Sequence, residues 1–137
     1  MNERRIQRIQ ELIKHRVAEV VDHDVGPAEV LEGGEAVGDG DTLSLGNANL
    51  SFVETRMLHW PDSMFTYLKE DKILFSSDAF GQHYAGPENF DDEIGDKIMP
   101  HAKKYYANIL LLYAAKTLKL LEKITEMGLE FNMICPD

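Results

Sequence analysis

Residues 57–68, MLHWPDSMFTYL, carry an imidazole and a carboxylate directly after an apolar segment. His59 and Asp62 lie three residues apart, and another carboxylate, Asp78, follows a second apolar segment. Imidazole nitrogen and carboxylate oxygen are ligands that zinc, iron and manganese accept, and a carboxylate can bridge two metal ions. A histidine or aspartate at the end of a strand more often caps the backbone, so the residue types alone leave both interpretations open.

Segments with strand-like composition precede both side chains. Residues 50–54 alternate apolar and polar and lead into the loop that carries His59, while residues 73–76 lead to Asp78. A third segment, residues 131–135, runs into Pro136 and Asp137. Loops at the carboxyl ends of strands are where α/β proteins place ligands and catalytic groups. We therefore expect His59 and Asp78 to lie close together at one edge of a sheet.

The other predicted elements build that sheet and cover it. Residues 42–45 and 50–54 flank Gly46-Asn47 and predict a β-hairpin, and residues 64–68 predict a further strand. Residues 79–99 are expected to form a loop. Helical spacing over residues 101–127 predicts one helix that ends at Gly128, with a buried stripe of Tyr106, Ile109, Leu110, Tyr113, Leu120, Leu121, Ile124 and Met127. The fold class is therefore α/β, with a mixed sheet flanked by helices.

The N-terminal third has a different character. Residues 1–21 predict an amphipathic helix whose basic face is exposed to solvent, and residues 22–40 predict a loop rich in glycine and acidic residues. Within that loop, residues 28–31 could form one short strand. Residues 41–137 then form the core of what we expect to be a single domain.

Composition narrows the class of partner. The 137-residue chain has 14 basic and 24 acidic residues and a formal charge of −10, which argues against nucleic acid and membrane surfaces as partners. Its one cysteine, Cys135, allows no intrachain disulfide and favours a reducing compartment. The longest apolar run, residues 109–115, is too short to span a bilayer. A cytoplasmic location is expected.

One long stretch resembles a known family. Residues 52–85, FVETRMLHWPDSMFTYLKEDKILFSSDAFGQHYA, closely resemble the metallo-β-lactamase-like domain of flavodiiron proteins, which are cytoplasmic O2 or NO reductases. Residues 39–46, 103–110 and 118–124 fit the same family, so the resemblance covers roughly residues 36–137. It implies a partial metallo-β-lactamase-like αββα sandwich.

The resemblance also implies a diiron site. The histidine of the LHWPDSM motif ligates one iron in that family and corresponds to His59, and the aspartate of the SSDAFGQH motif bridges both irons and corresponds to Asp78. The family takes electrons from FMN in the partner subunit of a head-to-tail dimer. The implied cofactor is therefore iron, the implied substrate is O2 or NO, and a homodimer is expected.

The sequence departs from the family in three respects. The family's His-x-Glu-x-Asp-His cluster has no counterpart, because Asp22-His23-Asp24 lacks that spacing. The family's last ligand, a histidine, would follow Asp137, and no flavodoxin domain is present, so this chain is not expected to bind FMN itself. We expect an incomplete, truncated domain that spans residues 1–137 and is inactive alone.

Two hypotheses therefore stand side by side. The chain is either a flavodiiron-type oxidoreductase domain or a non-catalytic remnant that serves as an oligomerisation or interaction module. Among the remaining candidates, His83 is expected to shape the loop around the site and Trp60 to pack or form an interface. Cys135 is expected to behave as a buried small apolar residue.

Overall fold

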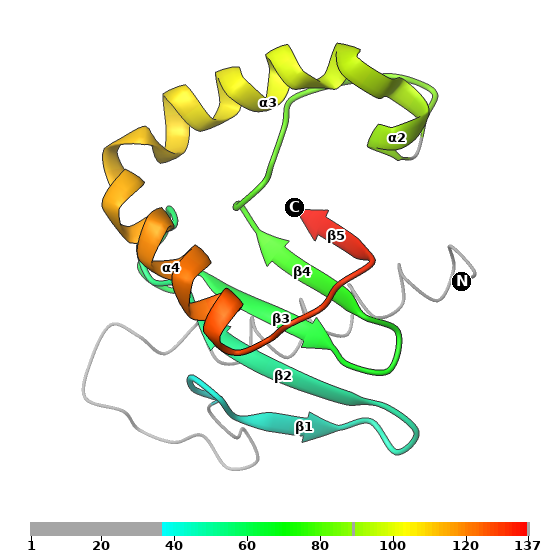
Figure 1. The fold of residues 1–137 in the computed structure, drawn as a ribbon, viewed down its shortest axis with the longest axis vertical. Coiled ribbons are helices and arrows are strands. Elements are labelled where there is room, and N and C mark those ends of the chain that lie inside the picture. The colour runs from blue at the N-terminus through cyan, green and yellow to red at the C-terminus, as the bar shows by residue number, and fades with distance from the viewer. Residues whose placement is uncertain (1–36, 89, 137) are drawn as a thin grey trace.

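The computed structural model describes residues 37–88 and 90–136. The predicted N-terminal helix, most of the glycine-rich loop and the short strand at residues 28–31 lie outside the described residues. The described part comprises a five-stranded sheet and a series of short helices (Figure 1).

The sheet runs in chain order from edge to edge. Its strands are β1 (Thr42–Ser44), β2 (Asn49–Glu54), β3 (Met64–Leu68), β4 (Ile73–Ser77) and β5 (Met133–Pro136). Neighbours from β1 to β4 pair antiparallel, whereas β4 and β5 pair parallel. The sheet is therefore mixed, as predicted, and the carboxyl ends of β2, β4 and β5 lie at the same edge.

The first hairpin forms where the turn residues predicted it. Gly46 has a φ of 89°, a conformation that glycine adopts without steric cost. The amide of Leu45 donates to the carbonyl of Ala48 at 2.7 Å and closes the turn. The glycine thus reverses the chain and brings β1 against β2.

Both faces of the sheet are apolar. Because side chains alternate along a strand, Val53, Phe65 and Leu74 share one face, on which Leu120 and Ile124 also pack. The opposite face carries a second buried cluster of Ala48, Leu50, Phe52, Leu68, Ile73 and Phe75. Burial of central strands on both faces is typical of α/β sheets, and it confirms the predicted fold class.

The helical region is more broken than the sequence predicted. The expected loop over residues 79–99 contains α2 (Asp91–Ile94) and the 3-10 turn η1 (Gly95–Ile98). The expected single helix is divided into α3 (Met99–Tyr105), the π-helical η2 (Tyr106–Leu110), the 3-10 turn η3 (Leu111–Tyr113) and α4 (Ala114–Glu126). Figure 1 shows these segments as an arc, with α4 crossing the sheet and α2 and α3 lying beyond β5.

The predicted buried stripe of this region is only partly correct. Leu110, Leu120 and Ile124 are buried, but Leu121 and Met127 are more than 40 % exposed. Successive residues point about 100° apart around a helix, so Leu120 and Leu121 cannot both face the sheet. The helix does end near Gly128, as predicted, where φ is 63°.

The last strand begins later than expected, at Met133. The segment before it is held by side-chain and backbone bonds: the Tyr67 hydroxyl donates to the carbonyl of Glu130 at 2.6 Å, and the amide of Asn132 donates to the carbonyl of Lys72 at 2.8 Å. Within the described ranges, no helix is both long and apolar enough to cross a membrane.

Candidate metal centre

His59 lies in a tightly bonded loop between β2 and β3. The amide of Thr55 donates to the carbonyl of Ser63 at 2.9 Å, which closes the base of the loop. The amide of Trp60 donates to Oγ of Ser63 at 3.1 Å, and the amide of Met57 donates to the carbonyl of Trp60 at 2.7 Å. The peptide bond between Leu58 and His59 is cis. The hydrogen bonds of the Met57 and Trp60 amides fix the backbone on both sides of the imidazole.

Asp78 lies in a second short turn, directly after β4. The buried hydroxyl of Ser76 donates to the carbonyl of Ala79 at 2.6 Å, and the amide of Ala79 donates back to the carbonyl of Ser76 at 3.1 Å. Ser77, between them, has a φ of 50°, a left-handed conformation that is costly for a residue with a side chain. The turn therefore directs the carboxylate by specific bonds rather than by continuing the strand.

The two turns bring the predicted ligands together. Nε2 of His59 lies 3.5 Å from Oδ1 of Asp78, and the two side chains are 26 % and 24 % exposed. Strands β2 and β4 point the same way because each is antiparallel to β3, so their carboxyl ends meet at one edge. The expected proximity of His59 and Asp78 is confirmed.

The spacing of these two atoms suits a shared metal ion. Two ligand atoms about 2.1 Å from one metal, at octahedral or tetrahedral angles, lie roughly 3.0–3.4 Å apart. An imidazole nitrogen with a carboxylate oxygen is also a donor set that first-row metals accept. Within residues 37–88 and 90–136, no group of three or more potential ligands gathers. The imidazole nitrogen and the carboxylate oxygen thus suit a metal ion in type and in spacing. Among the described residues they would fill two coordination positions of such an ion.

The other candidate side chains occupy different places. The indole ring of Trp60 lies 5.4 Å from the imidazole of His59, with 59 % of the residue exposed. The exposed His83 packs edge-on against the ring of Tyr105 at 5.1 Å, and its carbonyl oxygen lies 3.1 Å from Nδ1 of His101. Asp62 is exposed. The triplet Asp22-His23-Asp24 lies outside the described residues.

Two residues that were not predicted from the sequence, Gly81 and Tyr105, support the turn of Asp78. Gly81 lies so close to Tyr105 that a methyl group added at Gly81 would meet Cζ of that ring at 2.7 Å. The amide of Gly81 donates to the carbonyl of Asp78 at 3.2 Å. The only sequence signal for this support is the run of small residues around Asp78, which also includes Ser76.

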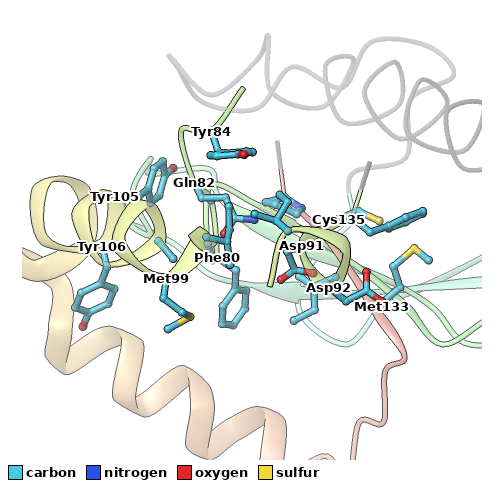
Figure 2. A pocket seen from close by; sticks show the side chains of 18 of the residues that line it. Phe80, Gln82, Tyr84, Asp91, Asp92, Met99, Tyr105, Tyr106, Met133 and Cys135 are labelled. Atoms are coloured by element: carbon cyan, nitrogen blue, oxygen red, sulfur yellow. The ribbon is translucent and has the colours of Figure 1, made fainter. Parts of the chain in front are cut away.

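A cavity of about 1390 Å³ opens beside the pair. Leu58 and Ala79, the chain neighbours of His59 and Asp78, contribute to its wall, although the two candidate ligands themselves do not. Much of the remaining wall comes from the loop of residues 80–88 and from α2, α3, α4 and β5 (Figure 2). Phe80 and Met99 supply apolar surface, and Asp91 and Asp92 bring carboxylates to the same space.

Comparison with curated proteins gives consistent relatives. The chain is 46 % identical over 104 residues to rubredoxin-oxygen oxidoreductase of Megalodesulfovibrio gigas, which covers 75 % of the chain and 26 % of that protein. It is 50 % identical to coenzyme F420H(2) oxidase of Methanothermobacter marburgensis and 47 % identical to nitric oxide reductase of Moorella thermoacetica. Each of these two matches covers 71 % of the chain and 25 % of the relative.

Solved structures agree in fold. Rubredoxin oxygen:oxidoreductase from Desulfovibrio gigas superimposes with a TM-score of 0.73 at 45 % identity, over 75 % of this chain and 26 % of that one. The flavodiiron protein from Giardia intestinalis gives 0.70 at 45 % identity, over 74 % and 25 %. The chain therefore spans about a quarter of the length of these relatives.

The match to a whole family extends further along the chain than these pairwise alignments. Residues 3–137 match the family described as ODP family beta lactamase. The sheet order, the loops that carry His59 and Asp78, and the resemblance to flavodiiron proteins all agree with that match. The chain belongs to the ODP family of beta-lactamase-like proteins and is homologous to the flavodiiron oxidoreductases.

Proposed function

We propose that His59 and Asp78 are iron ligands of a flavodiiron-type centre that reduces O2 or NO. The observation that carries this proposal is the 3.5 Å approach of Nε2 of His59 to Oδ1 of Asp78. Similarity to proteins named for oxygen and nitric oxide reduction supports the choice of substrate. Bound iron would supply the electron transfer to the gas.

The surroundings of the pair suit small apolar substrates. O2 and NO are little hydrated, and the adjoining cavity offers apolar wall from Leu58, Phe80 and Met99. The imidazole of His59 and the carboxylate of Asp78 are partly exposed, at 26 % and 24 %, and their chain neighbours Leu58 and Ala79 line that space. In this proposal, the tight turns at Ser63 and Ser76 hold the two ligands in place while the cavity admits the gas.

The number of donors defines what this chain contributes. Di-iron carboxylate sites use roughly six side-chain ligands, whereas the described residues bring two together. We therefore propose that further donors complete the centre, that electrons come from FMN bound outside residues 1–137, and that these residues in isolation do not turn over O2 or NO. The cytoplasmic location remains a prediction from the sequence.

Iron binding tests this proposal. The full chain is titrated anaerobically with Fe(II), and the retained iron is measured by elemental analysis after gel filtration. His59→Ala and Asp78→Ala should each lower the retained iron, whereas the matched control His83→Ala should leave it unchanged. About two irons per chain would support a complete site within this chain, and equal iron in all four proteins would contradict the assignment of His59 and Asp78.

A second candidate function rests on a separate observation. Several large apolar side chains of η3 and α4 are exposed, among them Leu111, Leu112 and Leu118. Large exposed apolar patches on soluble proteins often mark contact surfaces. This favours the alternative in which the chain acts as an oligomerisation module.

A further inference from the structure

One face of the sheet is buried although the described helices contribute nothing to it. We call its core the second cluster: Ala48, Leu50, Phe52, Leu68, Ile73 and Phe75. Leu68 and Ile73, in the middle of this face, are 0 % exposed. The partly buried apolar side chains that pack against the cluster come from strands and from residues beside β1: Val37, Leu43, Leu45, Met64, Met133 and Cys135.

The other face of the sheet shows what such burial requires. Leu74, the chain neighbour of Ile73 in β4, is also 0 % exposed, and there Leu120 and Ile124 of α4 supply the covering layer. Neighbouring residues of a strand point to opposite faces, so α4 cannot cover Ile73. An apolar sheet face is buried by packing against a further layer of the fold. The second cluster therefore requires a layer that the described helices do not supply.

The sequence of residues 3–20, which lie outside the described part, suits that layer. We call one series of its residues the N-terminal stripe: Ile6, Ile9, Ile13, Val17 and Val20. At about 100° per residue, these five side chains fall within roughly 80° of the circumference of a helix. Glu11 and His15 fall on the opposite side. A narrow apolar stripe with a polar opposite side is typical of a helix that packs on a single surface.

Length and charge suit the same pairing. A helix over residues 3–20 would be about 27 Å long, and five strands about 4.8 Å apart are about 19 Å across, so one helix can cross the whole sheet. Residues 1–21 contain five basic and three acidic residues, whereas the rest of the chain contains nine basic and 21 acidic. The positive segment is therefore attracted to the acidic remainder of its own chain.

We propose that residues 3–20 form a helix whose N-terminal stripe covers the second cluster. The sheet then lies between two helical layers, this helix and α4. In a complete αββα sandwich, the sheet face turned away from its helices packs against a second sheet. The helix occupies the place of that sheet, so a polypeptide that brings a second sheet can bind only by displacing it. This arrangement goes beyond the proposed iron site and does not depend on metal.

Cysteine labelling of the full chain tests whether the stripe is buried. Ile9→Cys and Ile13→Cys place a thiol on the stripe, and the matched controls Glu11→Cys and His15→Cys place one on the opposite side. Iodoacetamide labelling is mapped by peptide mass spectrometry, so that Cys135 is counted separately. The stripe thiols should label at least about tenfold more slowly in buffer than in urea, because a buried thiol reacts only while the helix is open. The control thiols should label at similar rates in both.

A double-mutant cycle tests which face the stripe meets. Ile73→Val and Leu74→Val make small changes on opposite faces of the same strand, so both variants should fold. Ile9→Ala or Ile13→Ala should couple with Ile73→Val by at least about a twofold change in the unfolding equilibrium constant, and both should be additive with Leu74→Val. Urea unfolding of the full chain measures these effects.

Four outcomes would overturn the proposal. Stripe thiols that label as fast in buffer as in urea would show that the stripe is not buried. Protection that is lost on dilution from about 100 to about 1 μM would show that a second chain covers the cluster. Coupling with Leu74→Val in place of Ile73→Val, or with neither variant, would show that the stripe does not pack on the second cluster. Iron enters none of these measurements, so their failure leaves the proposed metal ligands untouched.

Discussion

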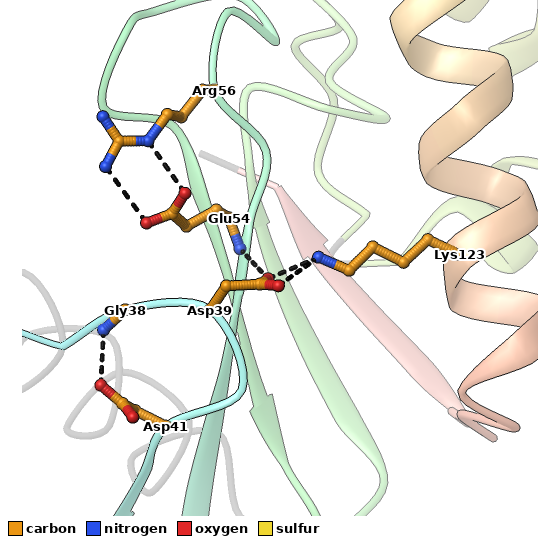
Figure 3. Close-up of polar contacts among 6 residues, drawn as sticks. All are labelled: Gly38, Asp39, Asp41, Glu54, Arg56 and Lys123. Carbon is orange, nitrogen blue, oxygen red and sulfur yellow. Dashed lines mark hydrogen bonds and ion pairs between the residues drawn. The ribbon is translucent and has the colours of Figure 1, made fainter.

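Lys123 on α4 holds Asp39, in the turn before β1, through both oxygens of its carboxylate. Nζ of Lys123 lies 2.5 Å from Oδ1 and 2.6 Å from Oδ2 (Figure 3). The same Oδ1 accepts a 3.0 Å hydrogen bond from the amide of Glu54 on β2. One carboxylate therefore joins the last helix to the first two strands, which are far apart in sequence. The hydrogen bond from Lys123 is the main reason that the pKa of Asp39 lies below its ordinary value.

Asp39→Asn should lower the free energy of unfolding by about 0.2–1 kcal/mol, the range for pairs that remain partly exposed. Both side chains are more than a third exposed, so solvent screens much of their attraction. Urea unfolding at neutral pH measures the loss. Asp62→Asn is the matched control, because Asp62 is exposed and makes no ion pair with another described residue.

The pH dependence of the same variant follows from the direction of the shift. A carboxylate whose folded pKa is lowered stabilises the fold fully above its unfolded pKa, here near 3.8, and less as the pH falls through the folded pKa. The difference in stability between wild type and Asp39→Asn should thus be constant from pH 7 to about pH 5 and should shrink below about pH 4. A difference that grows on acidification would contradict this assignment.

Ser76→Ala should destabilise the chain by about 1–2 kcal/mol, because the variant removes a donor from a buried carbonyl. Ser76 is fully buried, and its hydroxyl donates to the carbonyl of Ala79 at 2.6 Å. Since this bond shapes the turn that holds Asp78, the variant should also retain less iron at equal protein concentration. Ser51→Ala is the control, because its hydroxyl makes no hydrogen bond to another described residue.

The strands were predictable from the sequence because alternation of apolar residues and turn residues both lie within short segments of the chain. Alternation of apolar residues and a glycine turn suffice to predict the hairpin of β1 and β2. The proximity of His59 to Asp78 was predictable from strand direction alone. Its details depend on left-handed backbone conformations at Met57 and Ser77, residue types that give no sign of them in a sequence.

The helical arc was harder to predict because its shape depends on distant contacts. Residues 101–127 carry apolar side chains on more than one side, so their periodicity does not show which of them meet the sheet. The α-helix is interrupted at η2 and η3, and neither segment contains a glycine or proline from which the interruption could be predicted. Tyr105 likewise contacts Gly81 although the two residues are 24 positions apart, and the local sequence pattern does not predict this contact.

Gly81→Ala should destabilise the chain by about 1–3 kcal/mol through overpacking. The added methyl group would meet Cζ of Tyr105 at 2.7 Å, and that ring is buried and packed edge-on against His83. If the clash is the cause, Tyr105→Leu should cost less stability in the Gly81→Ala background than in the wild type. A double-mutant cycle in urea measures this coupling, and additive effects would contradict the steric explanation.

Cys135 should react slowly with alkylating reagents while the chain is folded. Burial raises the pKa of its thiol above the ordinary value of 9.0, and the thiolate is the reactive form. Iodoacetamide labelling at pH 8, followed by mass spectrometry, should therefore be slower in buffer than in urea, because the raised pKa lowers the thiolate fraction of the folded chain. The rate in buffer should also keep rising beyond pH 9. Cys135→Ser identifies the signal, because this is the only cysteine of the sequence. Equal rates in buffer and urea would show that the strand β5 does not shield the thiol.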